Sequence, residues 1–264
     1  MKTNEKIIAL GVGRKGCQIV NNMLSKKIEG VEFAGLRFKV EPEVLNLFEI
    51  PLKFNVENAE DCEKIISENF SGADIIFVIG DSPLAPYVAK SAKEAEILTI
   101  AIAPTNNEAL KAMLKENSDA VISFNENISW DEQINFSKII VEGISNLITK
   151  AGFVNLDFED IKAVLHDTGT AFLGTGRAEG DNRAEIAALQ ALNMCGEEIK
   201  KAKRVLINIT TGTEVSLGEM SYAAAAIEEI YSEAQIIWGH IIDDKMGYDL
   251  QVFLIAGLGD KKTL

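Results

Sequence analysis

Cysteine and histidine, the residues that most often build disulfide frameworks and zinc sites, are scarce in this chain. Its 264 residues include three cysteines and two histidines. Cys17, Cys62 and Cys195 lie far apart, and none belongs to a Cys-x-x-Cys pair. A disulfide framework needs an even set of cysteines, and a structural zinc site needs ligands at short spacings. We therefore expect buried thiols in a reducing compartment and predict no metal site.

Positive charge and long apolar runs are also scarce. Lys and Arg total 26 against 40 Asp and Glu, which gives a formal net charge of −14. Such a chain repels nucleic-acid backbones and anionic lipid surfaces, so we expect no nucleic-acid partner and no direct membrane binding. No apolar run approaches the roughly 18 residues of a membrane span, and the N-terminus lacks the apolar core of a signal peptide. A cytoplasmic location is the resulting prediction.

What the sequence does have is an alternation of short apolar runs with amphipathic stretches. Hydrophobic residues make up 47% of the chain, enough for a sizeable core. Before residue 128 the alternation predicts a doubly wound parallel sheet covered by helices. The predicted strands are Ile7–Val12, Glu32–Leu36, Asp74–Ile79, Leu98–Ala103 and Ala120–Phe124, and the predicted helices are Cys17–Lys27, Asp61–Phe70, Leu84–Glu94 and Glu108–Lys115.

A long amphipathic helix is predicted over Trp130–Lys150, because apolar residues recur there at helical spacing. It separates an N-terminal Rossmann-like domain, residues 1–127, from a mixed α/β domain, residues 152–264, with the helix region itself spanning 128–151. In the second domain we predict helices and strands in alternation, with the last two strands paired as a hairpin around residues 245–247. The predicted elements are Phe158–Leu165, Ala171–Gly174, Arg183–Asn193, Val205–Ile209, Leu217–Tyr231, Ile236–Ile242 and Leu250–Ala256.

A glycine-rich turn follows the first predicted strand. Residues 11–16 read GVGRKG, a G-x-G-x-x-G spacing between a strand and a helix. Glycines at Gly11, Gly13 and Gly16 allow close backbone approach, and a helix N-terminus offers N–H groups to a phosphate. A dinucleotide site would add an acidic residue after the second strand, but residues 35–39 read GLRFK. A phosphate turn and a plain structural turn, with Arg14 and Lys15 in solvent, both stay open.

Carboxylates stand at the start of another predicted helix. Asn155 or Asp157 can cap this helix, whose positive end favours acidic residues. Asp157 and Asp160 also lie near each other on its first turn, where two carboxylates and an amide could orient a water for attack on a phosphate. The residues alone are compatible with both interpretations.

A second glycine-rich stretch, GTGRAEGDNR at residues 174–183, invites comparison with a phosphate loop. It lacks the Lys-Ser/Thr pair of a P-loop, and Asp181-Asn182 suits a helix N-cap. We predict a structural turn.

Several longer segments together resemble the FtsZ/tubulin family. Residues 141–158, VEGISNLITKAGFVNLDF, resemble the end of the FtsZ central helix and the synergy loop after it. Residues 155–192 resemble the segment from the synergy loop through the next strand and helix, and residues 205–224 and 236–257 match the elements that follow, in order. These segments cover most of the chain between residues 141 and 257.

The resemblance implies a tubulin/FtsZ-like fold: an N-terminal GTPase-fold domain, a long central helix and a C-terminal domain with a four-stranded sheet. It also implies head-to-tail filaments, in which the synergy loop of one subunit completes the GTPase site of its neighbour. Asn155, Asp157 and Asp160 stand at the synergy loop, so they become candidate catalytic residues acting in trans on FtsZ or on a second copy. Because the chain ends at Leu264, we also expect no C-terminal adaptor-binding tail.

The phosphate side departs from the family pattern. Arg14 and Lys15 replace glycines of the first loop, and Gln18 stands for an Asn. The family's second phosphate loop is glycine-rich, whereas residues 80–87 here read GDSPLAPY. Proline lacks an N–H donor and Asp81 adds negative charge, so we do not expect the N–H nest that would hold the phosphates of GTP or GDP. Arg14 and Lys15 could bind an anion instead, or neutralise Asp81.

On the guanine side, Trp130 and Asn135 fall where the family stacks on and reads the base. Both residues also suit the packed and solvent-facing positions of a long helix. The main hypothesis is an FtsZ-like cell-division or cytoskeletal protein that acts as a pseudo-GTPase on FtsZ-type filaments, without autonomous hydrolysis. The alternatives are a divergent, self-polymerising GTPase and a dinucleotide binder.

Overall fold

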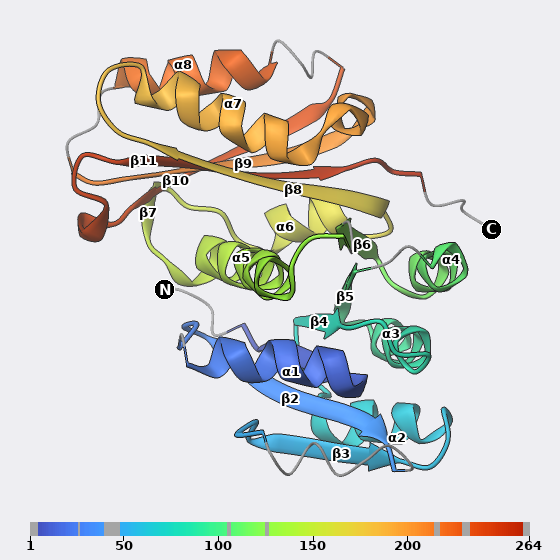
Figure 1. Cartoon of the computed structure of the whole chain (residues 1–264). Coiled ribbons are helices and arrows are strands. Elements are labelled where there is room, and N and C mark those ends of the chain that lie inside the picture. The colour runs from blue at the N-terminus through green and yellow to red at the C-terminus, as the bar shows by residue number, and fades with distance from the viewer. Residues whose placement is uncertain are drawn as a thin grey trace. The chain divides into compact units, whose positions relative to one another are not determined.

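The computed structural model describes residues 5–25, 27–39, 48–104, 107–124, 127–213, 217–228 and 233–260 (Figure 1). They form two compact units. The first comprises the described residues up to Ser145 together with Leu165–Gly169, and the second comprises the described residues within Asn146–Val164 and Thr170–Asp260. The short segment Leu165–Gly169 therefore belongs to the first unit although the chain on either side of it belongs to the second.

The first unit is built on a parallel sheet with the strand order β3-β2-β1-β4-β5-β6. Buried, near-continuous apolar strands such as β4 suit a sheet that is covered on both faces. The strand order reverses between β1 and β4, and in such sheets the carboxyl ends of the strands at the reversal form a binding crevice. The strands are β1 (Ile7–Val12), β2 (Val31–Phe38), β3 (Leu52–Val56), β4 (Ile75–Ile79), β5 (Leu98–Pro104) and β6 (Ala120–Phe124).

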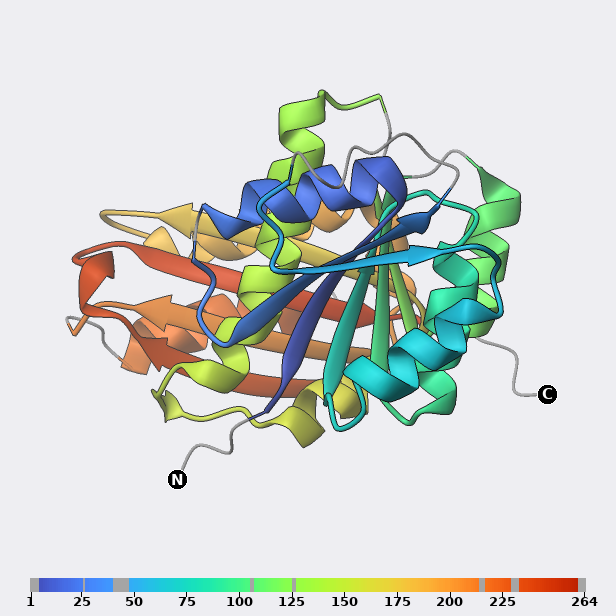
Figure 2. The same cartoon turned by 90° about the horizontal axis from the view of Figure 1, so that it is seen from below.

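Helices α2 (Asp61–Asn69), α3 (Ala85–Glu94) and α4 (Glu108–Asn117) share a buried apolar cluster with one face of this sheet. Helix α1 (Gly13–Leu24) lies on the opposite face (Figure 2). The long helix that the sequence predicts is α5 (Trp130–Thr149), which begins in the first unit and ends in the second. No helix within the described parts of the chain combines the length and apolarity needed to cross a membrane.

The second unit is built on four long strands in the order β8-β11-β9-β10, with the three-residue β7 at the edge beside β10. Helices α7 and α8 cover one face through an alanine-rich core, and α6 lies on the other face (Figure 1). The elements are β7 (Gly152–Val154), α6 (Phe158–Leu165), β8 (Gly169–Ala178), α7 (Arg183–Cys195), β9 (Arg204–Thr211), α8 (Leu217–Glu228), β10 (Gln235–Ile242) and β11 (Leu250–Gly257).

The predicted α/β class, with a parallel sheet covered by helices and a second α/β unit, is confirmed, but several local predictions were wrong. The last two strands do not pair as a hairpin: β10 runs parallel to β9 after the crossover through α8, and β11 inserts between β8 and β9. Part of the predicted turn at residues 174–178 is strand, since β8 continues to Ala178. Gly174 and Gly176 are needed there because added Cβ atoms would lie 2.0 Å from the Ala191 and Ala187 carbonyl oxygens of α7.

Two further corrections concern helix starts. Helix α1 begins at Gly13, in a left-handed conformation with φ of +72°, and not at Cys17. Asn182 does occupy the N-cap position of α7, but its side chain makes no capping hydrogen bond because its own backbone is left-handed. Predicted helix Leu217–Tyr231 extends past the described end of α8, so its last residues lie outside the described part of the chain.

Replacing Gly16 with alanine should destabilise the first unit severely. A Cβ there would lie 2.0 Å from the Ile79 carbonyl oxygen, and backbone on both sides leaves no room for relief. We expect the free energy of unfolding to fall by about 3 kcal/mol or more, measured by urea denaturation. Gly72→Ala is the control: its Cβ would meet nothing within 4 Å, and only its φ of +78° costs stability. Equal losses in both variants would contradict this account.

Candidate functional site

The glycine-rich turn and the loop after β4 meet at the crevice where the strand order reverses. Gly11 pairs in register with Ile79, so the two loops leave the sheet side by side. An added Cβ on Gly80 would lie 2.5 Å from the Val12 carbonyl oxygen, and one on Gly16 would meet Ile79. The backbones therefore touch directly, with no side chain between them.

The loop after β4 lies against the N-terminus of α1. Ser82 is buried, and its Cβ lies 2.7 Å from the place where a Cβ on Gly13 would be. The N–H of Leu84 donates to Ser82 Oγ at 3.3 Å, and the N–H of Ala85 donates to the Ser82 carbonyl at 2.9 Å. Since Pro83 has no N–H, the donors that follow Ser82 are engaged with the loop's own atoms.

A salt bridge crosses the same crevice. Lys15 Nζ lies 2.7 Å from Asp81 Oδ2, with the lysine side chain 56% exposed and the aspartate 31% exposed. Of the two roles that the sequence leaves open for Lys15, neutralising Asp81 is the one observed. Helix α1 has no side-chain cap and no acidic residue in its first turn, so Asp81 supplies the negative charge that its positive end favours. Arg14 is exposed on the same turn.

The remaining predicted nucleotide residues lie on β1, α1 and α5. Gly11, Gly13 and Gly16 are buried at the turn, and Gln18 is half-buried on α1. Trp130 is the first residue of α5 and is half-buried, while Asn135 is exposed one turn further along. Ser129 and Glu132 form a reciprocal capping pair at the start of α5. The roles of Trp130 and Asn135 toward guanine stay predictions.

In the second unit, Asp157 and Asp160 form a reciprocal capping box at the start of α6. The N–H of Asp157 donates to Asp160 Oδ2 at 2.9 Å, and the N–H of Asp160 donates to Asp157 Oδ1 at 3.1 Å. Asn155 Oδ1 accepts from the Gly152 N–H at 2.8 Å. Each carboxylate keeps a second oxygen outside this pair, and Asn155 and Asp157 are exposed to solvent. The capping hydrogen bonds therefore leave one oxygen of each carboxylate outside the pair.

Apolar side chains are exposed next to these carboxylates. Phe153 on β7 is 74% exposed, and Val154 and Ile242 on the paired strands are 42% exposed each. Leu156 points the other way and is buried against Gly239 of β10, which holds the loop to the sheet. We refer to Phe153, Val154, Ile242 and the carboxylates of Asp157 and Asp160 as the loop surface.

His240 lies beneath the loop surface. Thr211 donates its single hydroxyl hydrogen to the Gly212 carbonyl, so its oxygen accepts from His240 Nε2 at 2.9 Å. This assigns the proton of the neutral ring to Nε2 and leaves Nδ1 buried without a partner among the described residues. Burial lowers the pKa of His240, because a proton on Nδ1 would place an unpaired charge in the core.

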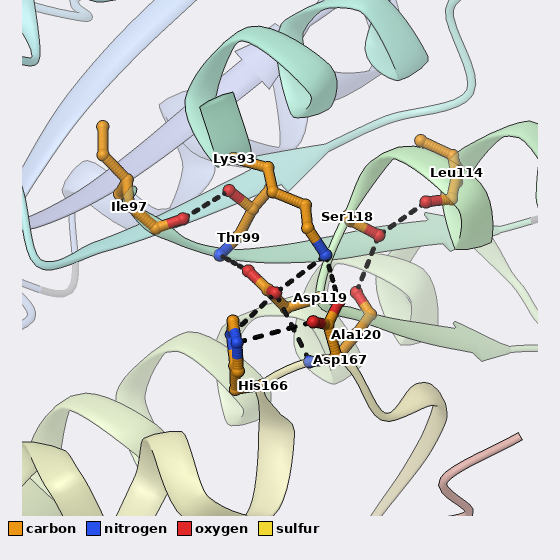
Figure 3. Close-up of polar contacts among 9 residues, drawn as sticks. All are labelled: Lys93, Ile97, Thr99, Leu114, Ser118, Asp119, Ala120, His166 and Asp167. Atoms are coloured by element: carbon orange, nitrogen blue, oxygen red, sulfur yellow. Dashed lines mark hydrogen bonds and ion pairs between the residues drawn. The ribbon is translucent and has the colours of Figure 1, made fainter. Parts of the chain in front are cut away.

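A group of charged residues in the first unit was missed by the sequence reasoning (Figure 3). Asp119, which is almost fully buried at the start of β6, lies 3.0 Å from His166 Nδ1 and 3.1 Å from Lys93 Nζ through its Oδ1 atom. Lys93 is also paired with Asp167. We call these four residues the Asp119 cluster. Lys93, Asp119 and the adjacent pair His166-Asp167 are far apart in sequence, and the only local signal is a carboxylate directly before a buried strand.

The sequence of this chain is similar to those of known FtsZ proteins. The family model described as "FtsZ family, C-terminal domain" matches residues 169–259. Cell division protein FtsZ 1 of Thermococcus kodakarensis is 31% identical over 95% of this chain and 80% of its own length. The chain belongs to the FtsZ family. Cell division protein FtsZ 2 of Rhizobium meliloti is 30% identical, over 98% of this chain and 89% of its own length.

Solved FtsZ-family structures share the fold. A structure described as "FtsZ dimer, empty", from M. jannaschii, has a TM-score of 0.81 at 23% identity, and the match covers 97% of this chain and 88% of that chain. CetZ from Methanosaeta thermophila has a TM-score of 0.72 at 16% identity and covers 96% of this chain and 87% of its own. The FtsZ family fold thus extends over both units, including the first one, where the loop sequences depart from the family pattern.

The stability of this FtsZ-family protein should depend on pH through His240. Its folded pKa lies below the ordinary value of about 6.5, so as pH falls through that value the unfolded chain binds a proton that the folded chain resists. The free energy of unfolding therefore decreases as the pH is lowered through this window. In His240→Gln this contribution is lost, so the difference in unfolding free energy between wild type and variant should change between pH 7.5 and 5. Urea denaturation followed by tryptophan fluorescence measures it, and a constant difference would contradict the assignment.

Proposed function

We propose that this FtsZ-family protein is a pseudo-GTPase that acts on FtsZ-type filaments, docking through its loop surface while holding no GTP of its own. The observation that carries the proposal is the arrangement of residues 80–85 in the crevice. Ser82 packs on Gly13, the N–H groups of Leu84 and Ala85 are engaged inside the loop, and Asp81 adds a carboxylate paired with Lys15. A bound triphosphate needs converging N–H donors where this loop offers a negative charge.

Docking through the second unit is supported by the ordered carboxylates and the exposed apolar side chains of the loop surface. In the FtsZ family the synergy loop of one subunit meets the nucleotide of its neighbour, and the M. jannaschii structure described above is of a dimer. Here the corresponding Asn155, Asp157 and Asp160 are held by the capping box and the Gly152 contact. Exposed Phe153 and Val154 supply apolar area beside them, as the core of a protein interface requires.

On a partner that holds GTP, Asp157 and Asp160 would orient the attacking water through their second carboxylate oxygens. Their positions are preset by the capping hydrogen bonds, so no ordering is needed when the partner arrives. The same subunit presents no nucleotide on its other side. The synergy loop of the next FtsZ subunit would then meet no bound GTP, and filament growth at that end would stop.

Adding substoichiometric amounts of this protein to a purified, GTP-hydrolysing FtsZ of the same organism should lower polymer mass. Light scattering measures the polymer, and phosphate release measures turnover per FtsZ subunit. The amount needed is small because each molecule acts at a filament end. No change in either quantity at equimolar protein would overturn the proposal.

Calorimetry with GTP, with GDP and with a magnesium-free control measures whether this protein binds nucleotide by itself. We expect no detectable heat from the wild-type protein alone. A micromolar affinity, about −8 kcal/mol, would favour the alternative of a divergent, self-polymerising GTPase in which Arg14 and Lys15 hold the phosphates. A control titration of the partner FtsZ with GTP shows that the assay detects binding.

A double variant separates capping from chemistry. Asp157→Ser with Asp160→Gln converts the capping box to the equivalent Ser-x-x-Gln form and removes both carboxylates. Its stability should stay within about 0.5 kcal/mol of wild type, whereas Asp157→Ala should lose about 1 kcal/mol. We expect the double variant to lose any effect on phosphate release by FtsZ. An unchanged effect on phosphate release would exclude a chemical role for the two carboxylates.

A further inference from the structure

The loop of residues 151–157, which leads to α6 and the candidate carboxylates, lies in the second unit together with strand β10. Backbone and apolar contacts hold much of this loop to that strand. An added Cβ on Gly152 would lie 1.8 Å from the His240 carbonyl oxygen, and the Leu156 side chain packs against Gly239. These contacts act after the loop has begun, so the residue at its start needs an anchor of its own.

An ion pair provides that anchor. Lys150 directly follows the last residue of α5, and its Nζ lies 2.8 Å from Asp243 Oδ2. Asp243 directly follows β10, and its N–H donates to the Thr211 carbonyl of β9 at 2.8 Å. Its other carboxylate oxygen, Oδ1, accepts from the Lys245 N–H at 3.1 Å. Asp243 is thus fixed to the sheet by its backbone and presents one oriented oxygen to Lys150.

The pair is partly sheltered from solvent. The Lys150 side chain is 34% exposed and that of Asp243 is 22% exposed. The hydrogen bond from Lys150 holds the pKa of Asp243 below its ordinary value, against the opposing effect of burial. Salt screens partly buried pairs less than exposed ones. The contact therefore stays formed at the ionic strength of a filament assembly assay.

The rest of the loop depends on this anchor because its pairing with the sheet is short. Strand β7 has three residues, and its register with β10 shifts between His240 and Ile241. Such an irregularity disrupts the ladder locally. The N–H of Gly152 donates to Asn155 Oδ1, so this turn is closed within the loop and not by the sheet. A displacement at Lys150 would therefore pass along the loop to the capping box.

We propose that Lys150 and Asp243 are positioning residues for the loop surface: their ion pair fixes where the loop begins and so keeps its two carboxylates aligned for a partner. The inference rests on the proposed function for its consequence, since aligned carboxylates matter only where they meet a partner's nucleotide. Both residues and the whole loop lie in the second unit. The effect of the ion pair on the loop can therefore be measured without any partner.

Hydrogen exchange on the isolated full chain tests the ion pair in Lys150→Gln and Asp243→Asn. The amides of Gly152 and Asp157 report on the loop, because each donates within it. We expect their exchange to become about fivefold faster in either variant. Asparagine keeps the Oδ1 acceptor for the Lys245 N–H and removes only the charge, so the turn after β10 stays capped. Asp243→Asn keeps the test open if Lys150→Gln folds poorly.

A double variant shows whether the two residues act as a pair. Lys150→Gln combined with Asp243→Asn should exchange no faster than either single variant, because both changes remove the same contact. Lys150→Arg keeps the charge and should exchange at the wild-type rate. Lys201→Gln is the matched control, since Lys201 is exposed in the same unit and makes no ion pair with any described residue.

Three results would overturn the proposal. In the first, Lys150→Gln changes the loop amides no more than Lys201→Gln does. In the second, the effects of the single variants add in the double variant, so that the residues act independently. In the third, exchange rises equally at Ile207 and Leu254, which pair in the middle of the sheet and would report a general loosening of the unit.

A functional arm separates this inference from the function on which it rests. In the FtsZ assay, Lys150→Gln should reduce the maximal effect on phosphate release with little change in the concentration at half effect, because Phe153 and Val154 still dock. Lys150→Arg should restore the wild-type maximum. If wild-type protein has no effect on FtsZ, the proposed function fails while the exchange comparison still decides the ion pair. If wild type acts and Lys150→Gln acts identically, the positioning role fails alone.

Discussion

Direct backbone contact between the turn after β1 and the end of β4 fixes the rest of the first unit's crevice. Gly16 sits against the Ile79 carbonyl and Gly80 against Val12, at distances that admit no Cβ. The contact determines where α1 starts and therefore where Lys15 and Ser82 come to lie. It also supplies a reason for the glycines that is independent of any ligand. A G-x-G-x-x-G spacing is required here by packing, so its presence alone is not evidence that a phosphate binds.

The two carboxylates of the loop surface show how a structural and a chemical role can reside in the same atoms. Each uses one oxygen to accept an N–H of the other residue and keeps its second oxygen outside the pair. The capping box thus restricts the rotamers of both side chains and leaves one carboxylate oxygen of each outside the pair. Capping and catalysis in trans are consequently compatible, and a variant that loses the two carboxylate charges but keeps the cap distinguishes the two roles.

Much of the fold follows from the sequence because buried parallel strands are apolar and helices repeat at their own period, as in β4 and α5. Strands β3 and β7 escape this reasoning, since β3 is a largely exposed edge strand and β7 has three residues. The place of β11 depends on long-range pairing that no local pattern encodes. For the same reason the Asp119 cluster could not be predicted from the sequence, because only the folded chain brings Lys93, Asp119 and Asp167 into contact. Gly174 and Gly176 led to the wrong prediction of a turn, because glycine is common both in turns and where a strand packs closely against a helix.

Magnitudes decide which departure from the family pattern matters most for nucleotide binding. The Lys15–Asp81 pair is largely exposed, and such pairs contribute about 0–1 kcal/mol. Hydrogen bonds from N–H groups to a charged acceptor contribute about 1.5–3 kcal/mol each, and a phosphate nest uses several. Removing the Asp81 charge alone would therefore recover little. The larger deficit lies in the backbone, where Pro83 and Pro86 have no donor and Leu84 and Ala85 donate to Ser82. In the pseudo-GTPase proposed above, rebuilding a GTP site would require a different path for residues 80–86, and with it a different start for α3.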